Sequence, residues 1–162
     1  MTTSRLGTSP SKRLPGYLWA VVLAWIRAKI LKQEFERAKR RALRIAAKKH
    51  KESTPLSITD GIETVILLEL WLASLHVVVE GYQESFLHSD SLLSDGKVDG
   101  LLDSQRCTRL KRFRNKVFHV VRRDHPDVLA VLNNYKDFIA WGEQVMKETG
   151  RVVFRSARAF TA

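Results

Sequence analysis

One apolar seam, spaced for a helix and running from Tyr17 to Ile45, constrains the fold of this chain more than any other feature. Apolar residues recur along it in alternating steps of four and three, which places them on one side of an α-helix. A seam of this length has to be covered, either by the rest of the chain or by a second copy. Its members are Tyr17, Val21, Ala24, Ala28, Leu31, Phe35, Ala38, Ala42 and Ile45.

The second predicted helix, from Ile58 to Phe86, is apolar nearly all round, which is typical of a central or interface helix. Ser57 or Thr59 is placed to cap its start. Residues 88–100 are acidic and rich in turn formers, so we expect a loop there.

Two more helices are predicted, over residues 101–121 and 127–149, with Gly150 ending the last one. We therefore expect an all-α fold, a bundle of four main helices. Residues 15–149 would form a single domain. Residues 1–14 would be a flexible N-terminal tail, and residues 150–162 a basic C-terminal tail, as a short extended arm.

The charge of the chain is strongly positive, with 28 Lys and Arg against 17 Asp and Glu and a formal net charge of +11. Such an excess attracts polyanions and speeds their encounter with the protein. Nucleic acid is the partner that we expect first, before an anionic membrane surface or an acidic protein. The outer face of the first helix is basic through Arg37, Lys39, Arg40, Arg41, Arg44, Lys48 and Lys49.

Cys107 is the one cysteine, which excludes an internal disulfide and a zinc site built from thiolates. We expect it to be a small buried residue in a protein of a reducing compartment, the cytoplasm. The apolar residues 17–26 follow basic ones as in a signal peptide, but they lack a small-residue cleavage site and their period continues into charged sequence. They are also fewer than the ~20 that span a bilayer. We predict no membrane association.

Arg114 is out of place in the third predicted helix. On a wheel of about 100° per residue it falls within a cluster of apolar residues. A guanidinium cannot lose its proton, so burying it unpaired would be costly. Either a core carboxylate pairs with the guanidinium, or the guanidinium lines a cleft that receives anions. The surrounding apolar residues are Cys107, Leu110, Phe113, Val117, Phe118 and Val121.

Helix two offers carboxylates for that role. Glu69, His76 and Glu80 lie within a narrow arc of its wheel, which is either the solvated edge of the helix or the partner of Arg114 through Glu80 or Glu69. Gly81, next to Glu80, would let another backbone or a ligand approach closely.

His119 is the second candidate for chemistry. It follows Arg114 by five positions, so in a regular helix the two side chains point roughly 140° apart. They can meet one phosphate only if the helix ends near His119 or if a second subunit supplies one of them. A histidine near a helix end is also commonly a surface residue or a partner of the helix dipole.

The segment Arg114-Asn115-Lys116-Val117-Phe118-His119 resembles the signature of HEPN domains, small helical bundles of which many are metal-independent RNases. That motif is an arginine, usually followed by a polar residue, with a histidine four to six positions later. Arg44 and His50 also fit this spacing. The segment beginning at Arg114 is favoured by Asn115, by its position late in the third helix and by the upstream stretch Val79-Glu80-Gly81-Tyr82, which resembles part of the preceding helix in some family members.

The resemblance implies an endoribonuclease whose two motifs line one cleft of a homodimer. His119 would act as general acid or base, since its pKa lies near neutrality. Arg114 would hold the phosphate, and Asn115 would orient the ribose or the scissile group. Attack by the 2′-OH would leave a 2′,3′-cyclic phosphate. Neither a cofactor nor a metal is expected.

Basic residues around the motif are expected to follow the RNA backbone, although each alone is more simply a solvated charge. Three functions remain open. The first is a dimeric HEPN-type endoribonuclease, such as a toxin or defence effector with an antitoxin or regulatory protein. The second is a catalytically inactive HEPN-like module that binds RNA or protein, and the third is a helical interaction protein that oligomerises through the Tyr17–Ile45 seam. The basic residues are Arg106, Arg109, Lys111, Arg112, Lys116, Arg122 and Arg123.

Overall fold

The protein is all-α, as predicted. The computed structural model describes residues 16–52, 61–88, 95–118 and 135–161, and these ranges contain no β-strand. The expected N-terminal tail, residues 1–14, lies outside the described ranges. Their helices are α1 (Gly16–Lys51), α2 (Ile62–His88), α3 (Gly96–Leu101), α4 (Ser104–Phe118) and α6 (Lys136–Thr161).

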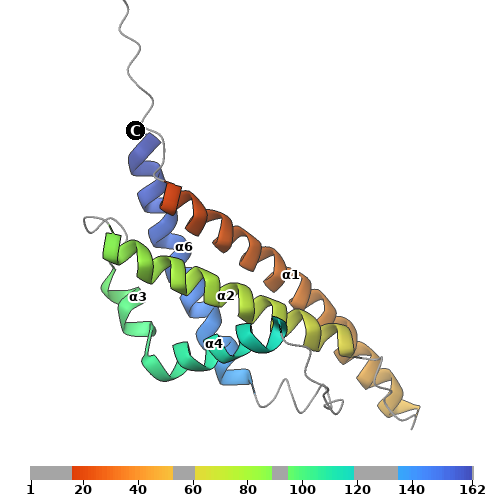
Figure 1. Ribbon diagram of the computed structural model, residues 1–162. Coiled ribbons are helices and arrows are strands. Elements are labelled where there is room, and N and C mark those ends of the chain that lie inside the picture. Colours follow the sequence, from red (N-terminus) through yellow and green to blue (C-terminus); the bar gives the residue numbers. More distant parts are fainter. Residues whose placement is uncertain (1–15, 53–60, 89–94, 119–134, 162) are drawn as a thin grey trace, which may run out of the picture.

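Helices α1 and α2 form a long antiparallel pair, with α6 crossing behind them and α3 and α4 below α2 (Figure 1). The seam of α1 faces this chain's own core: Ala28 and Phe35 are fully buried there, and Val21, Ala38 and Ala42 nearly so. The side chain of Tyr17 lies outside the described residues. Of the two alternatives for covering the seam, the structure shows the first, burial in this chain's own core.

Helix α2 is the central helix, as its apolar composition predicts. Trp71, Leu72, Leu75 and Val78 are all fully buried, and α2 contacts α1, α4 and α6. Residues Ile62–Glu84 are long and apolar enough to cross a membrane, by length and composition only, which is also common for the core helix of a soluble protein. Half of that stretch is buried inside this fold.

The start of α2 is at Ile62, four residues later than predicted. The carbonyl of Gly61 accepts hydrogen bonds from the backbone N–H groups of Thr64 and Val65, so the first turn begins after this glycine. Ser57 and Thr59, the predicted caps, lie outside the described residues.

Part of the predicted loop 88–100 is helical: the short helix α3 starts at Gly96. The Asp95 side chain caps it by accepting a hydrogen bond from the backbone N–H of Lys97, and Val98 is fully buried. Helix α4 then starts at Ser104, not at Leu101, because Asp103 interrupts the helical run and its carboxylate accepts from the N–H of Arg106.

Helix α6 does not end at Gly150 but continues to Thr161, so the predicted helix end and the extended arm are wrong. Gly150 is buried against the indole ring of Trp25, and an added Cβ would lie 2.6 Å from its Cζ2. Beyond it, Val152 and Val153 are fully buried. Residues 151–161 are therefore the packed second half of a helix instead of a separate tail.

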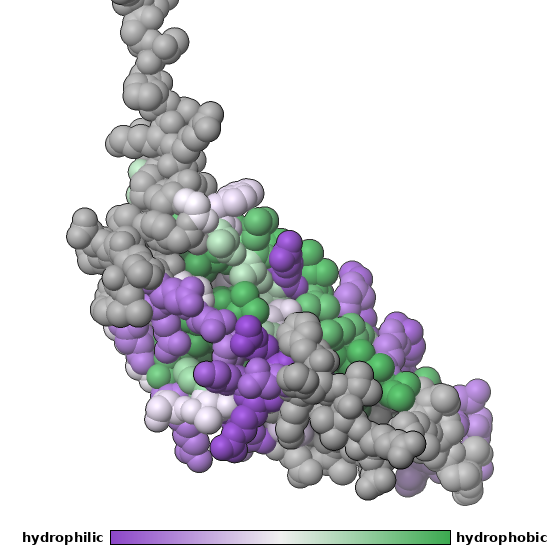
Figure 2. Space-filling model, viewed as in Figure 1, coloured by the Kyte–Doolittle hydropathy of each residue, from purple (hydrophilic) through white to green (hydrophobic). Residues whose placement is uncertain are grey.

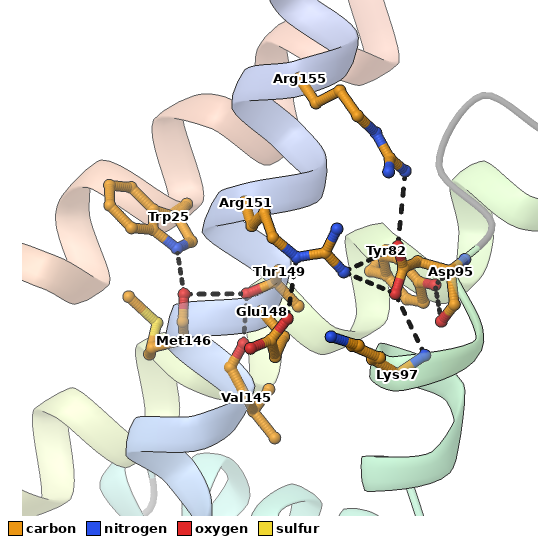
Figure 3. A network of polar contacts seen from close by, with 10 residues as sticks. All are labelled: Trp25, Tyr82, Asp95, Lys97, Val145, Met146, Glu148, Thr149, Arg151 and Arg155. Carbon is orange, nitrogen blue, oxygen red and sulfur yellow. Dashed lines mark hydrogen bonds and ion pairs between the residues drawn. The ribbon is translucent and has the colours of Figure 1, made fainter.

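A polar network fixes α3 to α2 and α6 (Figure 3). Arg151 of α6 donates to both carboxylate oxygens of Asp95 at 2.8 Å. The hydroxyl of Tyr82 accepts from the backbone N–H of Asp95 at 3.1 Å and donates to Oδ1 of Asp99 at 2.9 Å. Burial and the bond to Asp99 raise the pKa of Tyr82 to about 12, so the hydroxyl stays protonated.

Candidate functional site

The site centres on the face of α4 that packs on α2. Leu110 is fully buried on that face, and Cys107, one turn earlier, packs against the same core. Burial raises the pKa of the Cys107 thiol, which therefore stays protonated. Arg114 follows Leu110 by one turn and is half-buried. The helix thus brings a cation to the edge of an apolar contact.

The carboxylates expected to pair with Arg114 are Glu80 and Glu69 of α2. The described ion pair of Glu80 is with His76. The pairing of Arg114 with Glu80 or Glu69 stays a prediction. The anion-receiving role of Arg114 likewise stays a prediction.

His76 of α2 lies close to Arg114. Its side chain is 9% exposed, and Nδ1 is 3.6 Å from Oε2 of Glu80, one helical turn further on. Burial lowers the pKa of His76; Glu80 opposes this effect, and the positive charges of Arg114 and Lys111 add to it. The solvated-edge interpretation of the Glu69, His76 and Glu80 arc therefore fails at His76.

The two carboxylates of this arc are more open than the histidine. Glu69 is half-buried, and the side chain of Glu80 is 42% exposed. The close neighbour of Gly81 is the side chain of Val21 in α1, where a backbone or a ligand was expected: an added Cβ would be 3.1 Å from its Cγ2.

Several predicted site residues fall at or beyond the end of the described part of α4. Asn115 is described and exposed. For Lys116 only the backbone, in the last turn of α4, is described. His119, Arg122 and Arg123 lie outside the described residues, so the placement of His119 relative to Arg114 stays a prediction.

The outer side of α4 carries exposed basic residues, and one of them, Arg109, packs on two aromatic rings. The guanidinium of Arg109 stacks on the rings of Tyr135 and Phe138, at 4.9 Å and 4.8 Å from their centroids. Lys111 and Arg112 are also exposed. Arg109 is thereby held in a fixed orientation while its edge remains open to solvent.

Arg106 is also engaged within the chain. It lies 3.5 Å from Oδ2 of Asp103 and 5.9 Å from the centroid of the Trp141 ring. Part of its charge is therefore compensated within the chain.

Within the described ranges, no group of three or more His, Cys, Asp or Glu side chains could hold a metal ion. Comparisons of the chain with protein-family models, with curated proteins and with solved structures find no match.

The sequence missed the burial of His76, which the wheel placed between two carboxylates. The available signal was the composition of its helix: a histidine in a segment that is apolar on nearly every side has a high chance of being covered.

Proposed function

We propose that this chain is a metal-independent endoribonuclease of the HEPN type, with a helical bundle of that family's kind and a composite site in a homodimer. The observation that carries the proposal is the half-buried Arg114, which follows the fully buried Leu110 by one turn in α4, the helix that packs on α2. A fixed guanidinium in such a position can stabilise the charge that gathers on a phosphorane.

The reaction needs no group beyond the side chains of the motif. The 2′-OH attacks the adjacent phosphorus as its proton passes to a base, the bond to the 5′-oxygen breaks, and that oxygen takes a proton from an acid. His119 supplies the acid–base function, and Asn115 orients the ribose. The products are a 2′,3′-cyclic phosphate and a free 5′-OH.

The basic surface supports RNA as the substrate. Lys111 and Arg112 are exposed on α4, and Arg109 is held by the two aromatic rings beside it. Contacts of this kind follow a phosphate backbone without reading its sequence. Lys116, Arg122 and Arg123 would extend the same surface.

A homodimer is supported by apolar side chains that remain exposed on the two longest helices. They recur at helical spacing along each helix, and Figure 2 shows hydrophobic surface following the α1 edge of the molecule. An exposed apolar stripe of this kind marks an interaction surface. It consists of Trp19, Ile26 and Ile30 in α1 and Ile62, Ile66, Leu70 and Val77 in α2.

The test is cleavage of a single-stranded RNA in EDTA by the purified wild type and its variants. We expect Arg114→Ala to lower the rate about 10²–10³-fold and His119→Ala to lower it about 10²–10⁴-fold. Arg40→Ala removes one exposed positive charge of α1 and serves as the matched control with little effect. An RNA with a 2′-deoxy group at the scissile position should not be cut.

Equal cleavage by the wild type, Arg114→Ala and His119→Ala would remove the proposed site. Steeply salt-dependent RNA binding without cleavage would instead identify a catalytically inactive HEPN-like module, for which the same cationic surface suffices. Absence of RNA binding at low salt would leave a protein-interaction module.

A further inference from the structure

A depression lies on the outer side of α4. Its volume is about 490 Å³, within the range of about 300–1,000 Å³ that is usual for ligand pockets. Such pockets are mostly apolar, whereas every described residue that lines this one has a polar or cationic side chain able to donate hydrogen bonds. The described lining residues are Ser104, Gln105, Thr108, Arg109 and Arg112.

The chemistry of this lining favours an anionic ligand. Of the described lining side chains, two are guanidiniums, two are hydroxyls and one is an amide, and none is a carboxylate. The carboxylate next to them in the sequence, that of Asp103, is engaged by Arg106: Oδ1 accepts from the backbone N–H of Arg106 at 2.8 Å, and Oδ2 lies 3.5 Å from its Nε. All five lining residues are exposed, so a ligand reaches them from solvent.

Helical spacing brings the five side chains to one side of α4. At about 100° per residue they fall within an arc of about 140°. Arg109 and Arg112 are three positions apart, so their Cβ atoms lie about 5–6 Å from each other and both guanidiniums can bind one phosphate group. The fully buried Leu110 and the half-buried Arg114 fall on the opposite side of the same wheel. The depression is therefore separate from the proposed cleavage site.

Arg109 is oriented before a ligand binds. Its guanidinium lies 4.9 Å from the ring centroid of Tyr135 and 4.8 Å from that of Phe138. Phe138 is buried and stacks in turn on Trp141, with centroids 5.1 Å apart, so its ring is held by the core. Contacts with aromatic rings use none of the N–H donors of a guanidinium, so Arg109 can still donate to an anion. A side chain already held in place loses less conformational entropy when it binds.

We propose that this depression binds a backbone phosphate of single-stranded RNA. Arg109 and Arg112 donate to the phosphate oxygens, and the hydroxyls and the amide bind the adjoining ribose. The proposal deepens the nuclease function, on which it rests for the choice of RNA as the ligand. The site holds the strand and takes no part in breaking the bond, because it lies on the other side of α4 from Arg114.

The first test measures the binding of a fluorescent single-stranded 2′-O-methyl RNA, which lacks the attacking hydroxyl and so cannot be cut. Arg109→Gln and Arg112→Gln should each weaken binding about tenfold, since each removes a charge-assisted hydrogen bond. Each should also make the slope of log Kd against log salt concentration shallower by about 0.7, the value for one phosphate contact on a single strand. Arg40→Gln, with the same loss of charge on α1, should leave both quantities nearly unchanged.

A second measurement tests the orientation of Arg109. Tyr135→Leu removes one of its two rings and keeps an apolar side chain at this half-buried position. We expect this change to weaken RNA binding about threefold in the wild type and to have no effect in Arg109→Gln. An equal effect in both backgrounds would show that Tyr135 acts independently of Arg109 and would overturn its positioning role.

Unchanged binding and salt slope in Arg109→Gln and Arg112→Gln, or equal weakening by Arg40→Gln, overturns the site. Displacement of the RNA by inorganic phosphate at matched ionic strength would assign the depression to a free phosphate and likewise overturn the proposal. In the cleavage assay the two variants should raise KM and leave kcat unaltered, and a loss of kcat would contradict a purely binding role. A protein that binds RNA here but cuts none refutes only the nuclease, and one that cuts RNA with unaltered binding in both variants refutes only this site.

Discussion

Replacing Gly150 by alanine tests the packing of α6. Helix propensity alone predicts that this substitution stabilises the protein, whereas the packing predicts that it destabilises it. The residue lies inside the helix, where alanine is favoured over glycine by about 1 kcal/mol. In the structure, an added Cβ would lie 2.6 Å from Cζ2 of Trp25 and 2.7 Å from its Cε2 and Nε1. These are ring atoms, and the ring is itself packed edge-on against Phe154, with centroids 5.0 Å apart.

The cost of Gly150→Ala follows from these contacts. Forcing a methyl group into a packed core costs about 1–3 kcal/mol. A displaced ring also weakens the hydrogen bond from Nε1 of Trp25 to the carbonyl of Met146, 2.8 Å long (Figure 3), which is worth about 1 kcal/mol. The gain in helix propensity offsets the loss from the weakened hydrogen bond. The cost of overpacking remains, so we expect the free energy of unfolding to fall by about 1–3 kcal/mol.

The assay is urea unfolding followed by far-ultraviolet circular dichroism. Gly100→Ala is the matched control, since Gly100 is also helical and an added Cβ there meets no atom within 4 Å. This control should be stabilised by about 0.4–1 kcal/mol. Combining Gly150→Ala with Trp25→Phe removes the indole atoms that clash, so the cost of the alanine should largely disappear in that background. Stabilisation by Gly150→Ala alone, or a cost that Trp25→Phe does not relieve, would refute the packing argument.

Two further predictions concern the polar network that fixes α3. Tyr82→Phe removes the acceptor of the Asp95 N–H and the donor to Asp99, and should lower the free energy of unfolding by about 1–2 kcal/mol in the same urea assay; unchanged stability would exclude these bonds. The pKa of Asp95 is lowered, first by the hydrogen bond from Arg151, so its contribution to stability is present above its unfolded-state pKa and is lost as the pH falls through its lower folded-state value. Asp95→Asn should therefore be less stable at neutral pH and lose less stability on acidification, and an unaltered acid transition in thermal melts would contradict this.

The periodic segments were predictable because one face of each must be buried. The seam of α1 and the apolar composition of α2 place these helices without knowledge of their neighbours, and Phe35 and Trp71 stack at 5.9 Å between them. The predicted end at Gly150 failed for a different reason. A glycine can end a helix or let a ring approach it, and the sequence does not distinguish the two, because the ring belongs to Trp25, far away in the chain.

The sequence predicted only the features of the site that depend on a single helix. The wheel of α4 places Arg114 near Leu110, but the partner of a charge depends on which helix lies opposite and at what depth. His76 and Glu80 share an arc and are one turn apart, yet their side chains are 9% and 42% exposed. Burial outweighs the attraction of the nearby carboxylate, so the pKa of His76 falls.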